Sequence, residues 1–372
     1  FSPTPIPMPM LEKSISHLCE SINGCTHLEM LSIANINVNG VFNFSNLNCL
    51  TSLQLLNVSM SKECGESLCS TISACTLLEN LELQSVTLYE GVYQWKNLTN
   101  LTSLIMRNIT NPGESSVCSN ISGFTRLDYL YLTNMTLNER VFDLSSLQRL
   151  TSFTLSNVTI SEECCESMCN SISDCIHMEK LELRNVNLHD VELDLRNLRN
   201  LVYLQIQKVA MSRFICSSIS ACTLLEKLEL SGSMILPLHE VRLPTPWDKP
   251  IVYQSASLDT MESEIINLHG ELDLRCMTNL NSLLLCDVTM SEECTKSLCK
   301  SVKRCTHLKT LELVNIDLRE SLLDLSRVID LISLSLSRVA MSEKCCRCVC
   351  SSISRCIRLD KIRLDNLGHL DD

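Results

Sequence analysis

The strongest constraint in this sequence is a six-residue unit, Leu-x-x-Leu-x-Leu, that recurs along almost the whole chain. Thirteen copies begin at Leu28, Leu50, Leu78, Leu101, Leu127, Leu150, Met178, Leu201, Leu225, Leu280, Leu308, Leu331 and Leu359. Most copies lie 22 to 23 or 26 to 28 residues apart. A period of this length indicates stacked repeats, because a single repeat cannot bury its own apolar face.

Each unit predicts a short strand whose first, fourth and sixth residues are buried, and successive strands should form one parallel sheet. Four units are followed by a longer stretch with apolar residues at helical spacing, as in 61–73, where Cys64, Leu68, Cys69 and Ile72 recur. Ser61 and the early Glu63 are typical of a helix start. We therefore expect helices after the units at Leu50, Leu150, Leu280 and Leu331.

Shorter stretches follow the units at Leu28, Leu127, Met178 and Leu308, and they alternate apolar and polar residues over 41–44, 141–144, 191–195 and 322–325. These stretches are too short for a helix, so extended backbone is expected. The predicted fold is an α/β solenoid shaped like a horseshoe. Its inner layer is a parallel β-sheet, and its outer face alternates helices with short extended segments.

The chain should divide into a Pro-rich N-terminal segment (1–13), repeats over 14–232, an inserted loop over 233–264 and repeats over 265–372. The step from Leu225 to Leu280 is 55 residues, which leaves about 32 extra residues. That stretch holds four of the nine prolines and loses the repeat, which predicts a protruding loop. The chain enters on a helix tail and ends without a polar cap, so we expect it to be part of a longer protein.

The pattern Leu68-Cys-x5-Cys75-x2-Leu78-Glu-x-Leu-x-Leu83 resembles ribonuclease-inhibitor-like leucine-rich repeats. Within that class, the chain is most similar to the C-terminal region of invertebrate NOD-like (NACHT-containing) immune receptors. The resemblance implies a solenoid that senses a ligand or holds its receptor inactive. It covers only the repeats, because the chain contains no Gly-x-x-x-x-Gly-Lys-(Ser/Thr) nucleotide-binding motif.

The sequence departs from that family at the ninth repeat position, which usually carries Asn or Cys and here is aliphatic, as at Val58 and Val158. Asparagine often stands one place earlier, as at Asn57, Asn134 and Asn157. The polar groups of these loops must therefore find other partners.

The 23 cysteines recur mostly as Cys-x4-Cys-x5-Cys at helix positions. In the fifth unit Phe124 replaces the third cysteine, which a metal ligand or disulfide half would not tolerate. We therefore interpret these cysteines as small buried core residues. The cluster Cys345, Cys346, Cys348, Cys350 and Cys356 contains two extra cysteines, so metal binding or disulfide formation stays open there. No cofactor is expected.

Two further patterns have repeat-based explanations. His27, His177 and His307 each follow a cysteine by two residues, but other repeats hold Leu or Arg at this position, so it is a turn position rather than a zinc ligand. Asn-x-(Ser/Thr) occurs eight times, which alone would suggest a glycosylated secreted protein. Four of the eight are copies of one repeat position, so they count as little evidence for secretion. Because the repeats also carry many unpaired cysteines, a cytoplasmic location is predicted.

A partner is expected on the concave face, where parallel strands present repeat positions two, three, five, seven and eight in adjacent rows. Tyr and Arg are common interface anchors. The predicted partner-binding residues are Arg107, Tyr129, Tyr131, Arg184, Tyr203, Gln205 and Lys208.

The function predicted is non-enzymatic recognition of a protein or microbial ligand, as the sensing or autoinhibitory region of an intracellular immune receptor. The sequence has no nucleophile elbow, phosphate loop or local acid–base grouping. A net charge of -12 disfavours nucleic acid and favours a basic or neutral partner. No apolar run is long enough to insert in a membrane. Two alternatives remain open: an extracellular recognition or adhesion domain, and an intracellular scaffold or adaptor.

Overall fold

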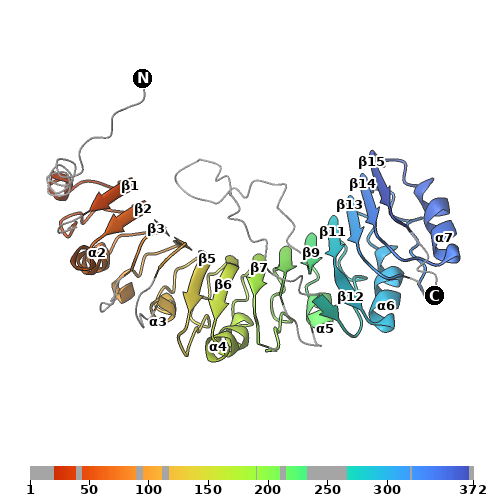
Figure 1. Cartoon of the computed structure of the whole chain (residues 1–372), viewed down its shortest axis with the longest axis horizontal. Helices are drawn as coiled ribbons and strands as arrows, with labels where there is room; N and C mark the ends of the chain where they lie inside the picture. The colour runs from red at the N-terminus through yellow and green to blue at the C-terminus, as the bar shows by residue number, and fades with distance from the viewer. Residues whose placement is uncertain are drawn as a thin grey trace, which may run out of the picture. The chain divides into compact units, whose positions relative to one another are not determined.

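The computed structural model describes residues 21–38, 44–88, 95–110, 117–189, 191–209, 215–232, 266–318 and 321–367. The chain forms two compact units. One comprises Phe1–Ser167 and Pro244–Asp248, and the other Met168–Leu243 and Lys249–Asp372. The predicted N-terminal segment 1–13 and inserted loop 233–264 lie outside the described residues. In each unit the strands lie along one side and the helices along the other (Figure 1).

The first unit contains a parallel sheet whose strands follow chain order. They are β1 (Met30–Val38), β2 (Ser52–Met60), β3 (Asn80–Gln84), β4 (Ser103–Arg107), β5 (Tyr129–Leu137) and β6 (Ser152–Ile160). Equivalent repeat positions pair across the strands, as in Leu53 with Leu81 and Leu81 with Leu104. The leucines of the repeat therefore form continuous rows, as the sequence predicts.

The second unit continues the same pattern in the order β7 (Lys180–Val186), β8 (Tyr203–Gln207), β9 (Lys227–Ser231), β11 (Ser282–Cys286), β13 (Thr310–Val314), β14 (Ser333–Ser337) and β15 (Lys361–Asp365). A separate pair joins β10 (Ile266–Leu268) to β12 (Val288–Met290). Leu228 of β9 pairs with Leu283 of β11. The repeat register thus continues across the 55-residue step.

Helices follow the four units for which they are predicted: α2 (Lys62–Ala74), α4 (Glu162–Ile172), α6 (Glu292–Val302) and α7 (Glu343–Ile353). The side chains of Ser61, Ser161, Ser291 and Ser342 each accept the backbone N–H of the first cysteine of the helix, at 3.2 to 3.3 Å. Shorter elements occur at η1 (Trp95–Asn97), α3 (Val117–Ile121) and α5 (Ile215–Ser220). The serine caps satisfy N–H groups that the helix itself leaves without acceptors.

The predicted extended segments 141–144, 191–195 and 322–325 contain neither helix nor strand, and an aspartate shapes each of them. Asp143, Asp194 and Asp324 each accept the backbone N–H of the residue two places later, at 2.9 to 3.0 Å, and Asp273 does the same in the equivalent segment 271–274 of the second unit. This is the turn that aspartate side chains favour. Segment 41–44 is described only at Phe44.

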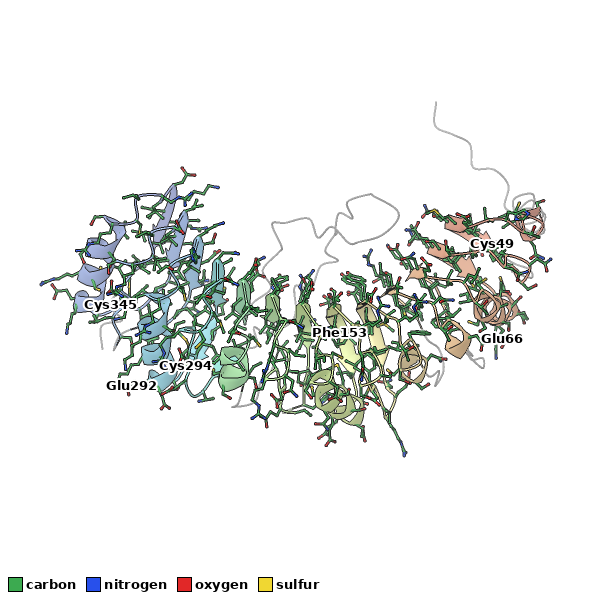
Figure 2. The ribbon with its side chains drawn as sticks, turned by 180° about the vertical axis from the view of Figure 1, so that it is seen from behind. Cys49, Glu66, Phe153, Glu292, Cys294 and Cys345 are labelled. Atoms are coloured by element: carbon green, nitrogen blue, oxygen red, sulfur yellow. The ribbon has the colours of Figure 1, made fainter. Side chains whose placement is uncertain are left out.

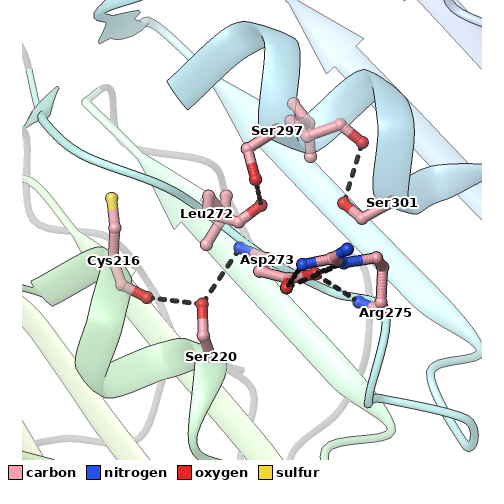
Figure 3. A network of polar contacts seen from close by, with 8 residues as sticks. Cys216, Ser220, Leu272, Asp273, Arg275, Ser297 and Ser301 are labelled. Carbon is pink, nitrogen blue, oxygen red and sulfur yellow. Dashed lines mark hydrogen bonds and ion pairs between the residues drawn. The ribbon is translucent and has the colours of Figure 1, made fainter. Parts of the chain in front are cut away.

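One such segment lies between two helices of the second unit (Figure 3). The Asp273 N–H donates to the Ser220 hydroxyl of α5 at 3.0 Å, and the Ser297 hydroxyl of α6 donates to the Leu272 carbonyl at 3.2 Å. Arg275 also donates through its side chain to Asp273. These contacts tie α5 and α6 to the same stretch of backbone.

The core lies between the strands and the outer layer and is filled by the repeat leucines with buried cysteines and phenylalanines. Leu55, Phe124 and Phe153 have no measurable exposure. Figure 2 shows Phe153 within the stack, whereas Glu66 and Glu292 lie on the outward side of α2 and α6. Phe124 occupies the place of the third cysteine of other repeats. The interpretation of that cysteine as a core residue is confirmed at Cys75, Cys175, Cys222, Cys305 and Cys356, which are buried, whereas Cys25 in the first repeat is exposed.

The early asparagine of the repeat has a conformational role. Residues at the eighth repeat position have φ near +50°, including Asn57, Asn134 and Asn157. Asparagine tolerates this left-handed conformation better than most residues. The Asn134 side chain donates to Asn108 at 2.6 Å, and Asn157 donates to Asn134 at 2.9 Å. This asparagine ladder gives the amides the partners that the ninth position does not supply.

Candidate functional site

The candidate site is the face of the sheet that points away from the leucine core. Successive residues of a strand point to opposite faces. Because the fourth and sixth repeat positions enter the core, the third, fifth and seventh lie on the opposite face. The predicted residues Arg107, Tyr129 and Tyr131 belong to the first unit, whereas Arg184, Tyr203, Gln205 and Lys208 belong to the second unit. We describe the two groups separately.

In the first unit the structure brings Arg107, Tyr129 and Tyr131 together. The two tyrosine rings are nearly parallel, at 5°, and their centroids are 6.4 Å apart. The Arg107 guanidinium lies over the Tyr131 ring, 4.9 Å from its centroid, which is a cation–π arrangement. The pattern placed these tyrosines on the surface, yet Tyr129 is 6% and Tyr131 2% exposed. Their rings are covered because they stack on each other and under Arg107.

Arg107 also connects this aromatic pair to a polar chain on the neighbouring strands. Its Nη1 lies 3.5 Å from a Glu82 carboxylate oxygen, and both side chains are 5% exposed. The other Glu82 oxygen accepts Gln54 at 2.7 Å, and Gln54 accepts the Ser32 hydroxyl at 2.7 Å. A continuous row of contacts thus crosses β1 to β5.

In the second unit Tyr203 is the centre of a network on β7, β8 and β9. The Lys180 and Lys227 ammonium groups lie 5.4 and 4.7 Å from the centroid of its ring. Its hydroxyl donates to Glu229 at 3.1 Å and lies 3.2 Å from the Gln205 side-chain oxygen. Burial, reinforced by nearby carboxylates, raises the pKa of the Tyr203 hydroxyl, so the hydroxyl stays protonated as a donor.

The same network contains Arg184 and Gln205, which were both predicted. Arg184 donates from Nε to the Gln205 oxygen at 2.7 Å, and its Nη2 lies 3.1 Å from Glu182. Glu182, which is 1% exposed, also pairs with Lys180 at 2.9 Å, and Glu229 pairs with Lys227 at 2.6 Å. We call this set the β7–β9 network: Lys180, Glu182, Arg184, Tyr203, Gln205, Lys227 and Glu229.

Lys208 is placed differently from the other predicted residues. It follows β8 at the eighth repeat position, with φ of 49°, and its backbone N–H donates to the Ser231 carbonyl at 2.7 Å. The residue as a whole is buried, with 8% of its surface exposed. The structure therefore assigns Lys208 to the turn at the end of the strand, beside the network rather than within it.

Sequence reasoning missed Glu82, Lys180, Glu182, Lys227 and Glu229 as members of these groups. The available signal was the Lys-x-Glu pair, which occurs on β7 and again on β9, the two neighbours of β8. Residues two apart lie on the same face of a strand, so each pair places its lysine and glutamate side by side. The pairing also changes the expected electrostatics. Three cations and two carboxylates form the β7–β9 network, so the glutamates of these strands are already neutralised.

The cysteines of α7 and Cys356, which follows that helix, divide between environments. Cys345 and Cys356 are buried, Cys346 and Cys348 are partly exposed, and Cys350 is exposed. Within the described ranges, no three His, Cys, Asp or Glu side chains gather in a way that could hold a metal ion. In the same ranges, no helix is both long and apolar enough to cross a membrane.

Comparisons with known proteins support the fold. No protein-family model matches the chain, and no curated protein matches its sequence. An internalin from Listeria monocytogenes superposes with a TM-score of 0.61 at 15% identity, over 100% of this chain and 95% of the internalin. The plant peptide hormone receptor RGFR1, solved with RGF2, gives 0.53 at 15% identity, over 94% and 53%.

A third similar structure is the Arabidopsis receptor kinase HAESA, solved with the peptide hormone IDA and the co-receptor SERK1. It gives a TM-score of 0.51 at 16% identity and covers 93% of this chain and 55% of the receptor. Together with the repeats and the parallel strands, these likenesses show that the chain has a leucine-rich-repeat fold. At such low identity these similarities are evidence for the fold alone, and the function has to be argued from the side chains.

Proposed function

We propose that the chain is a non-enzymatic recognition solenoid and that the β7–β9 network binds a protein or microbial ligand. The observation that carries the proposal is the position of Tyr203, partly exposed between the Lys180 and Lys227 ammonium groups. Tyrosine supplies a large contact area with few rotatable bonds, and here the flanking contacts fix its ring before any partner arrives. Such preorganisation lowers the entropy cost of binding.

The charge balance of the network favours a neutral or mixed partner over a strongly basic one. Glu182 and Glu229 are each already paired with a lysine, and Arg184 adds a further positive charge. A partner would therefore add contacts to the exposed edges of Tyr203, Lys180 and Lys227 without having to neutralise a buried carboxylate. Aromatic and cationic side chains of this kind dominate many protein interfaces.

We further propose that this recognition serves an intracellular innate immune receptor, as its ligand-sensing or autoinhibitory region. The support is the resemblance of the Cys-containing repeats to those of NOD-like receptors. An intracellular location is also consistent with the described cysteines, which are all free thiols rather than halves of disulfides. The transcript upstream of Phe1 tests the assignment. A nucleotide-binding module encoded there is expected, and a secretory signal or an F-box would contradict it.

Binding itself can be tested with a panel of purified microbial proteins and cell-wall fragments on the immobilised chain. Each ligand that binds is then measured against Tyr203→Ala and against Ser333→Ala, which changes the same repeat position on β14. Loss of binding with Tyr203→Ala alone is the expected result. Equal binding to both variants, or no binding across the panel, counts against the proposal.

An extracellular recognition domain is the second candidate, because four of the Asn-x-(Ser/Thr) asparagines, Asn57, Asn97, Asn108 and Asn134, are exposed. Asn120, by contrast, is 2% exposed and could not carry a glycan in the folded chain. Expression through a secretory pathway followed by glycopeptide mapping distinguishes the candidates. Secretion of folded protein with glycans at the exposed asparagines would favour the extracellular candidate. If the glycosylated chain is instead retained in the cell, and is secreted only when these asparagines carry no glycan, the intracellular candidate is favoured.

A further inference from the structure

Cysteines from successive outer helices contact each other, although the Cys-x4-Cys spacing gives no hint of it. The Cys118 sulfur of α3 lies 3.9 Å from the Cys164 sulfur of α4, and neither residue has measurable exposure. In the second unit Cys216 of α5 and Cys294 of α6 are buried, and each side chain shifts the pKa of the other. Each pair joins the second cysteine position of one helix to the first position of the next.

The sequence spacing of the pairs follows one rule. Cys118 and Cys164 are 46 residues apart. Cys216 and Cys294 are 78 apart, which is the same 46 once the 32 extra residues after Leu225 are removed. Cys299 and Cys345 are again 46 apart, and the nearby Cys345 adds to the burial that raises the pKa of Cys299. The contact is therefore a property of the repeat rather than an accident of one site.

We propose that Cys118/Cys164 and Cys216/Cys294 are redox-sensitive sites at which a peroxide closes a disulfide between successive outer helices. The Cys118 and Cys164 sulfurs are 3.9 Å apart, so closure to the S–S distance of about 2 Å needs only a small movement. Cys216 and Cys294 occupy the equivalent helix positions in the second unit. The helices are held in place for this reaction. Polar contacts from α5 and α6 to the 272–275 segment fix both helices on one backbone stretch (Figure 3).

The geometry also assigns the roles of the two sulfurs. Cys164 and Cys294 lie in the first turn of their helices, three residues after the capping Ser161 and Ser291, whose hydroxyls accept their backbone N–H groups. Their partners, Cys118 and Cys216, occupy short helices of five and six residues. The pKa of Cys294 is lowered, mainly because Cys216 donates to it, whereas the same contact raises the pKa of Cys216. Cys294 is thus the nucleophile and Cys216 the resolving thiol.

The reaction balances with hydrogen peroxide as the oxidant. The Cys294 thiolate attacks one peroxide oxygen, the O–O bond breaks, and a sulfenic acid and hydroxide form. The Cys216 sulfur then attacks the sulfenic sulfur, the S–O bond breaks, and a second hydroxide leaves. The protons of the two thiols convert both hydroxides to water. Two thiols and one peroxide give one disulfide and two waters, and the peroxide takes up two electrons.

Limited oxidation of the full chain tests the proposal. The reduced protein is treated with hydrogen peroxide at up to a few equivalents, denatured, alkylated, digested without reduction and analysed by mass spectrometry. The expected products are peptides linking Cys118 to Cys164 and Cys216 to Cys294, removed by dithiothreitol. The links should exceed any that involves Cys169 by at least about tenfold. Cys169 holds the equivalent second position in α4, but Ile215 stands 46 residues later.

Single variants keep the test interpretable if a substitution disturbs folding. Cys118→Ser should abolish the first link and retain the second, Cys216→Ser should do the reverse, and Cys169→Ser should retain both. The surviving link in each variant reports that the stack is intact. The proposal is overturned if the folded wild type yields these four cysteines as thiols or sulfinic acids, or if links scatter over the exposed cysteines Cys25, Cys276 and Cys350 instead.

Discussion

Arg107 contacts Tyr131 and Glu82 at once. Its guanidinium carbon lies 4.9 Å from the centroid of the Tyr131 ring, and its Nη1 lies 3.5 Å from the Glu82 carboxylate. One cation thus covers an aromatic ring of β5 and balances a buried charge of β3. On the open face of this sheet, side chains are therefore organised by contacts across strands, which the repeat brings into the same register in every unit.

Removal of this cation should be costly. Arg107→Ala is expected to lower the free energy of unfolding by about 3 to 5 kcal/mol, because it leaves the Glu82 carboxylate buried without its counter-charge. Urea unfolding followed by circular dichroism measures the loss. Adding Glu82→Gln to Arg107→Ala should recover a large part of it. If the double variant loses as much as the two single variants combined, the pair is not coupled.

The left-handed asparagines make a second prediction. Asn134 has φ of 52° and both donates to Asn108 and accepts from Asn157. Asn134→Val should destabilise the chain by about 1 to 2 kcal/mol or more, because a β-branched residue resists this conformation. Asn134→Gly loses the ladder contacts but fits the backbone, so its loss should be smaller. Equal losses for valine and glycine would show that backbone conformation is not the cause.

Phe124 is the phenylalanine that fills a cysteine position. Phe124→Ala should cost about 3 to 5 kcal/mol, since it opens a large cavity in a position without measurable exposure. Cys175→Ala changes the equivalent position, which is also buried, and should cost less because only one sulfur is removed. Thermal unfolding of the two variants compares them. A loss below about 1 kcal/mol for Phe124→Ala would mean that the site collapses around the smaller residue.

Three aspartates of the outer segments predict how stability depends on pH. The pKa values of Asp194 and Asp273 are lowered mainly by hydrogen bonds from Arg196 and Arg275, and that of Asp324 by Ser326. A lowered pKa means that the unfolded state binds more protons, so the contribution is complete above the ordinary Asp pKa of about 3.9. It should disappear as the pH falls through the lower folded values.

Urea unfolding between pH 3 and pH 6 checks this dependence. The midpoint of the wild type should fall over the acidic end of the range, and the decline should be shallower when Asp194, Asp273 and Asp324 are all replaced by Asn. Asparagine keeps the turn-forming acceptor but carries no titrating charge. An unchanged decline in the triple variant would assign acid sensitivity to other carboxylates.

Much of the fold could be predicted from local pattern. The leucine spacing defined the strands, and a serine followed by an early glutamate marked the helix start, as at Ser61 and Glu63. These features depend on neighbours in sequence. The burial of Tyr131 and the Cys118/Cys164 contact depend instead on residues 24 and 46 positions away, Arg107 and the partner cysteine. Such contacts can be predicted only when it is known which side chains of neighbouring repeats lie opposite one another. The repeat pattern placed the leucines in rows but did not show which of the other side chains touch.

The candidate site was predicted in part for the same reason. Tyr203 and Arg184 were recognised because tyrosine and arginine stand out by type, and Gln205 because it lies in the same central repeats. The structure joins all three in one network. The lysines beside Tyr203 went unnoticed because each looked like an ordinary exposed charge. Their role arises from strand pairing, which places Lys180 and Lys227 on either side of Tyr203.

The central claim is that the β7–β9 network is a recognition surface, and the dissociation constant of Tyr203→Ala for a microbial ligand from the panel tests it most directly. Tyr203→Ala should weaken binding about 30-fold or more, as expected for an anchor worth about 2 kcal/mol, whereas Ser333→Ala should bind like the wild type. Both variants must retain the wild-type circular dichroism spectrum. A Tyr203→Ala dissociation constant within about twofold of the wild type would contradict the claim.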